Sequence, residues 1–60
     1  MKLKELYKKE FKKVPFIGIY EGKGKSIYPE YADELLETHG DMEVVDYLYI
    51  ENKNTLVVQF

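Results

Sequence analysis

The sequence predicts an α+β fold in which two helices pack on one face of a small sheet of three to four mostly antiparallel strands. Three patterns predict it: two segments have apolar residues at helical spacing, one short segment is rich in β-branched and aromatic residues, and two apolar runs flank a turn. The expected helices cover about residues 2–13 and 29–39, and the expected strands cover residues 16–20, 43–51 and 55–60, the last two forming a C-terminal β-hairpin. With no repeat and no linker sequence, residues 1–60 are expected to form a single domain.

The first helix is expected over residues 2–13, because apolar side chains recur there at three- to five-residue steps and form one stripe. The stripe consists of Leu3, Leu6, Tyr7, Phe11 and Val14. Pro15 ends the helix, since the residue before a proline is disfavoured in helical geometry. Residues 2–13 also hold six lysines and two acids, whereas the rest of the chain holds three lysines and nine acids.

The segment of residues 16–20 is expected to be a strand, with Ile17 and Ile19 on one face and Phe16 and Tyr20 on the other. Gly18 lies in the middle of this strand. A glycine inside a strand indicates a bulge or a closely packed neighbour.

A glycine-rich turn follows at residues 21–26. Its Gly24-Lys25-Ser26 run matches the end of a phosphate-binding loop, in which backbone amides hold phosphate oxygens. The remaining spacing excludes that motif, because the glycine required five positions earlier is missing and Pro29 delays the helix that should begin at the serine. We therefore expect a hairpin turn, with residues 26–28 returning as a short strand or as loop.

The second helix is expected over residues 29–39. Pro29 suits its first position, because the missing amide proton would have no partner there. Acidic residues in the first turns complement the helix dipole, and Gly40 is placed to close the helix. His39 lacks an oriented acid partner in the sequence pattern, so we do not expect it to act as a catalytic base.

The C-terminal hairpin is expected to have a three-residue loop, Asn52 to Asn54, with Asn54 in the left-handed conformation that such a loop requires. A two- or four-residue loop is rejected, because a one-residue slip would send the apolar sets of the two strands to opposite faces. The expected core face consists of Leu48, Ile50, Leu56, Val58 and Phe60. The opposite face carries Val45, Tyr47, Tyr49 and Val57, which is unusually apolar for a surface that meets only water.

Composition narrows the classes of function. The chain has no cysteine and one histidine, which excludes disulfides and argues against a structural zinc site. No apolar run is long enough for a signal peptide or a membrane span, so we expect a cytoplasmic protein that does not contact membranes. A domain this small has little room for a ligand pocket of the usual size, about 300–1,000 Å³. We therefore expect no enzyme activity, no catalytic residue, no cofactor and no metal.

The whole pattern is similar in outline to that of one kind of short protein. A lysine-rich first helix precedes a glycine turn at Gly22 to Gly24, an acidic helix near Tyr31 to Leu36 and a closing hairpin from Val44-Val45 to Thr55-Leu56-Val57-Val58. In this order and in its use of lysine, glutamate and tyrosine, the chain resembles the short uncharacterised proteins of phages and mobile elements of low-GC Gram-positive bacteria. The resemblance covers nearly the full length without a signature motif. It implies a small accessory protein that binds a host or defence protein, and it transfers no functional residue.

The leading hypothesis for function is a non-enzymatic protein-binding module that forms a homodimer. Two helices can cover only one face of the expected sheet, and aromatic and apolar residues are expected on the other. Tyrosine is enriched in binding surfaces because it offers a large contact area with few rotatable bonds. The candidate interface residues are Phe16, Tyr20, Val45, Tyr47, Tyr49 and Val57.

Two alternatives use charge instead. The lysines of the first helix are candidates for nucleic-acid binding, and Lys23 and Lys25 would add charge from the glycine-rich turn. The helix candidates are Lys4, Lys8, Lys9, Lys12 and Lys13. In the reverse arrangement, an acidic run would imitate a nucleic-acid backbone and inhibit a DNA-binding enzyme. That run consists of Glu30, Asp33, Glu34, Glu37, Asp41 and Glu43.

Overall fold

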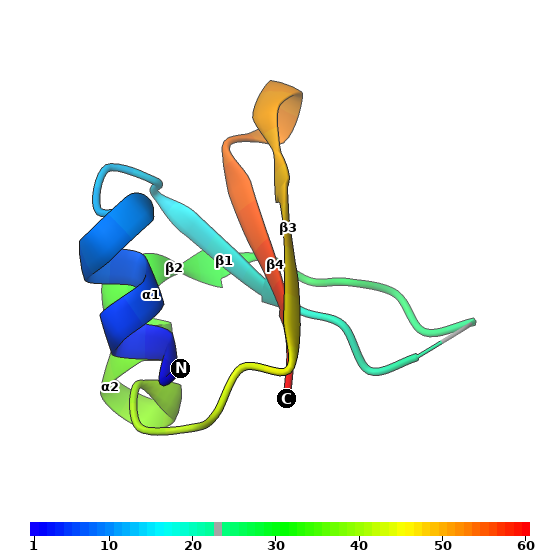
Figure 1. The fold of residues 1–60 in the computed structure, drawn as a ribbon. Coiled ribbons are helices and arrows are strands. Elements are labelled where there is room, and N and C mark those ends of the chain that lie inside the picture. The colour runs from blue at the N-terminus through cyan, green and yellow to red at the C-terminus, as the bar shows by residue number, and fades with distance from the viewer. Residues whose placement is uncertain (23) are drawn as a thin grey trace.

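The computed structural model describes residues 1–22 and 24–60, and within them the chain forms two α-helices and one four-stranded mixed sheet (Figure 1). The elements in chain order are α1 (Leu3–Glu10), β1 (Phe16–Ile19), β2 (Glu30–Tyr31), α2 (Ala32–His39), β3 (Asp46–Ile50), the 3-10 turn η1 (Glu51–Lys53) and β4 (Thr55–Gln59). The predicted α+β fold with a C-terminal β-hairpin is confirmed. Lys23, which the charge-based hypothesis included, lies outside the described residues.

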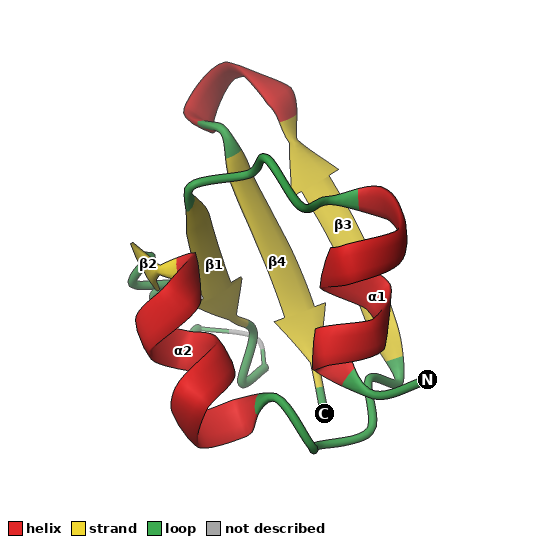
Figure 2. Ribbon diagram, turned by 90° about the vertical axis from the view of Figure 1, so that its left-hand side faces the viewer, coloured by secondary structure: helices red, strands yellow, loops and turns green. Residues whose placement is uncertain are grey.

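The strands lie in the order β2-β1-β4-β3 (Figure 2). Strand β1 pairs antiparallel with β2, and β3 pairs antiparallel with β4, as a mostly antiparallel sheet requires. The two halves are joined by a parallel pairing between β1 and β4, in which Ile17 lies beside Leu56 and Ile19 beside Val58. Parallel neighbours need a long crossover connection. The chain between β1 and β4 includes α2, which crosses one face of the sheet.

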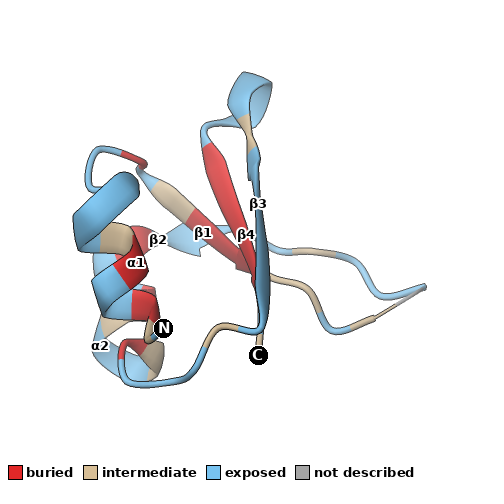
Figure 3. Cartoon of the chain, viewed as in Figure 1, coloured by how far each residue is buried: buried red, intermediate tan, exposed pale blue. Residues whose placement is uncertain are grey.

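Both helices cover that same face, and the core lies between them and the sheet (Figure 3). The core residues are Leu3, Leu6, Val14, Ile17, Ala32, Leu35, Leu56 and Val58. Each helix therefore contributes its apolar stripe, and the two central strands contribute alternate residues. Fully burying one leucine side chain is worth about 1.5–3 kcal/mol, so this small group of side chains supplies most of the driving force for folding.

The first helix is shorter than predicted. It ends at Glu10, because Phe11 leaves helical geometry and its carbonyl accepts a hydrogen bond of 2.9 Å from the Val14 amide. The Tyr7 hydroxyl donates to the Val14 carbonyl at 2.7 Å and holds this turn against the helix. Val14 is therefore buried, although it lies outside the helix. Its burial accounts for the apolar residue at this position of the sequence pattern.

The second helix begins later than predicted. Pro29 does not start it, since Glu30 and Tyr31 pair with β1 as β2 and the Ala32 amide donates to the Pro15 carbonyl at 2.9 Å. Residues 26–28 are not a strand, which settles the question that the sequence left open. The two residues of β2 pair with Phe16 and Ile17 of β1, so this short strand replaces the first expected turn of helix.

The predicted helix end at Gly40 is confirmed, for a different reason than a left-handed cap. Gly40 is right-handed, with φ −59°, and its amide donates to the Leu36 carbonyl. The Lys4 amide at the start of α1 donates to the Gly40 carbonyl at 3.0 Å, so the two helices meet closely here. A Cβ atom at this position would collide with the Leu36 carbonyl oxygen.

The hairpin register differs by one residue from the prediction. Ile50 pairs with Thr55, so the loop has four residues, 51–54, although Asn54 is left-handed at φ 49° as expected. Tyr49 lies opposite Leu56, and Tyr47 lies opposite Val58. A one-residue shift exchanges the two faces of a strand.

This shift moves β3 side chains to the faces opposite to those expected. The assignment of Leu48 and Ile50 to the core face was wrong, whereas Leu56, Val58 and the partly buried Phe60 do contact the core. The side chains of β3 that face the helices are Tyr47 and Tyr49.

The aromatic rings of β3 suit the helix side because they are long. Tyr47 and Tyr49 both pack on Phe11, with ring centroids 5.7 and 5.9 Å apart. A tyrosine can cover apolar surface with its ring while its hydroxyl stays in water. The two side chains are accordingly 45% and 37% exposed. They close the edge of the core beside α1, and the aliphatic residues of β3 are left on the other face.

Candidate protein-interaction surface

The six predicted interface residues do not share one face. Phe16 on β1, Tyr20 directly after β1, and Val57 on β4 alternate with core residues. This alternation places them on the open face of the sheet, away from the helices. Tyr47 and Tyr49 lie on the helix side. Val45 precedes β3 and is 74% exposed. The expectation of one tyrosine-rich face was therefore wrong. Three of the six residues do lie on the open face, but Val57 is only 6% exposed there.

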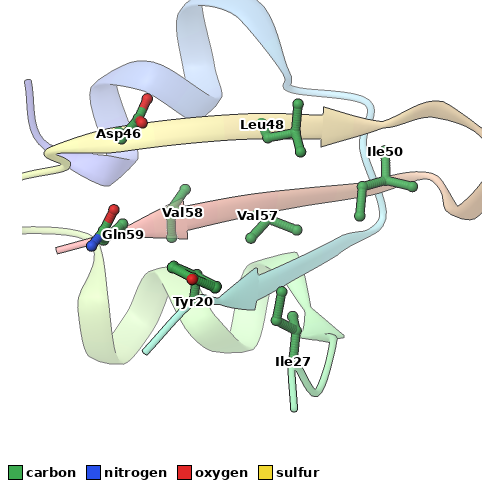
Figure 4. Close-up of a pocket in the computed structure, with 8 residues that line it drawn as sticks. All are labelled: Tyr20, Ile27, Asp46, Leu48, Ile50, Val57, Val58 and Gln59. Atoms are coloured by element: carbon green, nitrogen blue, oxygen red, sulfur yellow. The ribbon is translucent and has the colours of Figure 1, made fainter. Parts of the chain in front are cut away.

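The open face instead presents an apolar groove with a volume of about 300 Å³ (Figure 4). Its lining residues are Tyr20, Ile27, Asp46, Leu48, Ile50, Val57, Val58 and Gln59. The polar members, Asp46 and Gln59, pair with each other across the β3–β4 ladder at one end. The rest of the lining is dominated by aliphatic side chains and the Tyr20 ring, so the groove is suited to apolar contact.

Gly18 lies where the chain itself covers part of the open face. A Cβ atom at Gly18 would lie 2.5 Å from Cγ2 of Ile27, so the segment after β1 folds back over the space that a side chain would fill. The sequence prediction of a close neighbour at this glycine is confirmed. The segment around Ile27 thus covers the open face at Gly18, whereas no described segment covers Leu48 on β3. Leu48, in the middle of β3, is 64% exposed.

Along Asp46–Ile50 the outer edge of β3 pairs with no other described strand, because β3 is the last strand in the sheet order. Just before this strand, the Val44 amide donates to the Met1 carbonyl at 2.9 Å. The Tyr20 amide donates to the Val58 carbonyl at 2.8 Å, so the backbone groups of Val58 point toward β1. Backbone groups alternate in direction along a strand, so those of Val57 and of its partner Leu48 point toward each other. The amides and carbonyls of Tyr47 and Tyr49 consequently point away from the sheet.

Edge strands of stable monomers usually carry lysine, proline or a bulge that prevents pairing with another chain. The sequence of β3, Asp-Tyr-Leu-Tyr-Ile, has neither lysine nor proline. Its single polar device is Asp46, whose Oδ1 accepts a hydrogen bond of 2.9 Å from the outward Tyr47 amide. The edge is therefore only partly protected.

Sequence reasoning missed Leu48, Ile50 and Ile27 as surface residues. One signal in the hairpin would have found the first two: the observed register pairs Asp46 with Gln59, whereas the predicted register pairs Asp46 with Phe60. Matching the polar residues of the two strands favours the observed register. No comparable local signal identifies Ile27.

The predicted lysine surface is only partly retained. Lys4 forms an ion pair of 2.7 Å with Asp41, which raises the pKa of Lys4 and lowers the pKa of Asp41. Lys8, Lys9, Lys12 and Lys13 are exposed near the C-terminal end of α1, and none of the four forms an ion pair with another described residue. Positive charge is favourable at that end of a helix, so the helix dipole accounts for their placement without a ligand.

The residues of the acidic run also differ in their contacts. Asp41 is held by Lys4, and Glu43 accepts a 2.8 Å contact from the N-terminal ammonium group, which lowers the Glu43 pKa. The remaining acids of the run lie on β2 and α2 and are exposed. Two of the six acids are thus in ion pairs, and the other four are exposed on β2 and α2.

The one histidine of the chain contacts a threonine and a phenylalanine. His39 is 2.7 Å from Thr38 Oγ1 through its Nδ1, and its ring stacks on Phe60, so neither contact supplies an orienting carboxylate. Residues 1–22 and 24–60 contain no group of three or more His, Cys, Asp or Glu side chains placed to hold a metal ion. Neither described helix has the length and apolar character needed to cross a bilayer.

Comparison with known proteins adds no assignment to this geometry. The chain matches no protein-family model, no curated protein and no solved structure. Its most distinctive surface feature is accordingly the apolar groove with the adjoining free edge of β3.

Proposed function

We propose that this chain is a non-enzymatic protein-binding module that self-associates through the exposed apolar side of β3. The observation that carries the proposal is the position of Leu48, which is 64% exposed at the centre of an edge strand and lines the groove with Ile50 and Val57. A single exposed leucine is ordinary on a protein surface. An exposed leucine that continues an apolar groove forms a patch, and such patches are typical of interaction sites.

The small size of the core also favours self-association. A chain of 60 residues buries only about 60% of the surface that its unfolded form exposes, so its own core is small. Covering Leu48 would remove about two thirds of a leucine side chain from water, which is worth about 1–2 kcal/mol per copy. Association therefore adds stability that neither disulfides nor zinc supply here.

A protein partner suits the groove better than a small ligand. Its volume, about 300 Å³, is at the lower limit of ligand pockets, and its polar side chains lie at one end only. Small-molecule sites usually combine an enclosed shape with a few converging polar groups. The proposal retains the role that the resemblance implies, a cytoplasmic accessory protein of a phage or mobile element that binds a host or defence protein.

The test is the mass of the protein in solution, measured by sedimentation equilibrium from micromolar to millimolar concentration. The wild type is expected to approach twice 7.1 kDa as concentration rises. Leu48→Lys should remain at the monomer mass, because it places a charge in the proposed contact. Tyr28→Lys is the matched control, since Tyr28 is 77% exposed and lies outside the lining of this groove. A wild type that stays monomeric, or a Leu48→Lys variant that associates normally, would overturn the proposal.

Nucleic-acid binding is the second candidate, favoured by the four exposed lysines near the end of α1 that are free of ion pairs with described residues. Such binding weakens steeply with salt, because phosphate contacts release counterions. Retention on DNA or RNA at about 50 mM salt that disappears near 200 mM would support it. No retention at the lower salt concentration would end this alternative.

A further inference from the structure

The backbone groups on the free edge of β3 are complementary to those of the same edge in a second copy. Only Tyr47 and Tyr49 direct their amide and carbonyl groups outward, whereas Leu48 between them is bonded to β4. In an antiparallel pair, two residues that lie opposite each other exchange two hydrogen bonds when their backbone groups face each other. Two copies related by a two-fold axis through Leu48 would place Tyr47 of each opposite Tyr49 of the other.

In this register, all the outward amide and carbonyl groups of β3 form hydrogen bonds. Other positions of the two-fold axis leave some of them without a partner. An axis through Tyr47 would set Tyr49 opposite Val45, whose amide already donates to the Gln59 carbonyl at 2.7 Å. An axis through Tyr49 would set Tyr47 opposite Glu51, where the chain has left the strand and entered η1. An axis between two residues would set an outward group opposite one that is bonded to β4.

We propose that two copies of this chain pair their β3 strands antiparallel about Leu48 and so join two four-stranded sheets into one continuous sheet. The inference rests on the proposed self-association and specifies its geometry. It follows the general mode in which a strand is added to an exposed sheet edge, where backbone hydrogen bonds give affinity and side chains give specificity. The occupant is a second copy because the same edge provides both halves of the pairing.

The pairing would bring like side chains of β3 together on each face. Opposite residues in an antiparallel ladder share a face, so the two Leu48 side chains would meet on the open face with Cα atoms about 4.5 Å apart. The apolar grooves of the two copies would then adjoin. On the helix side, Tyr47 of each copy would lie across from Tyr49 of the other, beside the Phe11 ring that both already contact.

Charge and area are compatible with a modest dimer. The one charged residue of the strand, Asp46, would lie opposite Ile50 of the second copy, so the ladder sets no like charges opposite each other. One strand pair with a few half-exposed side chains lies at the low end of specific interfaces, below about 1,200 Å². We therefore expect a reversible dimer rather than an obligate one.

Asp46 would regulate the affinity. Its carboxylate holds the outward Tyr47 amide at 2.9 Å in the single chain, and it must release that amide before the second copy can accept it. Asp46→Ala removes this competitor and is expected to tighten the dimer.

The experiment compares two substitutions at the same residue by sedimentation equilibrium. Tyr49→Pro removes the outward amide but leaves the β3–β4 hydrogen bonds, since proline is tolerated where a strand's N–H faces away from its neighbour. Tyr49→Ala removes the same ring and keeps the amide. The proline variant loses two of the four hydrogen bonds across the axis, so its dissociation constant should exceed that of the alanine variant about 30-fold or more.

The outcomes separate this inference from the proposed function. A monomeric, folded Tyr49→Pro beside a dimeric Tyr49→Ala supports edge pairing. Equal association of these two variants, with association still lost in Leu48→Lys, overturns edge pairing and leaves self-association through the open face standing. A monomeric wild type overturns both.

Amide exchange of the wild type provides a second measurement if Tyr49→Pro does not fold. The Tyr49 amide should exchange quickly in dilute protein and slowly in protein concentrated enough to be dimeric, because pairing gives that amide an acceptor. The Leu48 amide, which faces β4, is the internal control and should be protected at both concentrations. Fast exchange of Tyr49 in a sample of dimeric mass would overturn the inference.

Discussion

The hairpin register makes a sharp prediction about two leucines that lie on adjacent strands. Leu56 is fully buried, whereas Leu48 is 64% exposed on the opposite face. Truncation of a buried leucine to alanine costs about 2–5 kcal/mol, so Leu56→Ala should cost about 3 kcal/mol. Only about a third of the Leu48 side chain is covered, so Leu48→Ala should cost about 0.5–1 kcal/mol.

Urea unfolding followed by circular dichroism measures both values, at a protein concentration low enough to keep the chain monomeric. A domain of this length has a total stability of about 3–9 kcal/mol, so Leu56→Ala approaches complete unfolding. All titrations are therefore run in the same concentration of trimethylamine N-oxide, which strengthens burial. With a urea dependence of about 1 kcal/mol per molar, the two midpoints should fall by about 3 M and less than 1 M.

A third variant controls for the strand itself. Tyr49→Ala lies next to Leu48 on β3 but removes a ring that packs on Phe11, so it should cost more than Leu48→Ala. If Leu48→Ala costs as much as Leu56→Ala, and Tyr49→Ala costs little, then the three-residue loop is the true register. That result would refute the assignment of Leu48 to the open face and both proposals built on it.

Three further predictions concern the backbone and the surface charges. Gly18→Ala should cost about 1–3 kcal/mol in urea unfolding, because its Cβ would meet Ile27, and most of that cost should vanish when Ile27→Ala is added; additive costs would contradict the contact. Asn54→Gly should leave the unfolding midpoint nearly unchanged while Asn54→Ala costs about 1 kcal/mol, since Asn54 is left-handed; equal effects would argue against that conformation. The Asp41 pKa is lowered by Lys4, so this pair stabilises the fold above the unfolded pKa of Asp41, and the contribution is lost as pH falls through the folded pKa. Thermal unfolding from pH 7 to pH 2 should therefore depend slightly less on pH in Asp41→Asn than in the wild type, and an unchanged profile would show that the exposed pair contributes nothing.

The sequence predicts the elements of this fold because their signals are local. Leu3 and Leu6 in α1, and Leu35 in α2, recur at helical spacing, and their helices form where that spacing begins. The left-handed turn residue and the close contact in β1 are likewise each indicated by one residue, Asn54 and Gly18. These features need no knowledge of distant parts of the chain.

The register and the pairing of β1 with β4 depend on distant parts of the chain. Both faces of β3 are apolar, so alternation alone does not say whether the tyrosines or the aliphatic residues face the helices. The position of Phe11 at the end of α1 decides it, because the long rings of β3 can reach this residue. The structure places Tyr20 and Val57 on the open face, as predicted. It places Tyr47 and Tyr49 on the helix side, contrary to the prediction.

The position of β4 between β1 and β3 has a consequence for synthesis on the ribosome. The parallel ladder joins residues 16–19 to residues 55–58, so the two central strands meet only after nearly all the described chain has been made. Pairings between distant segments form slowly, and unpaired strands are prone to associate with other chains in the meantime. Until β4 pairs with it, β3 has two unpaired edges along Asp46–Ile50, and at that stage it is most prone to associate with other chains.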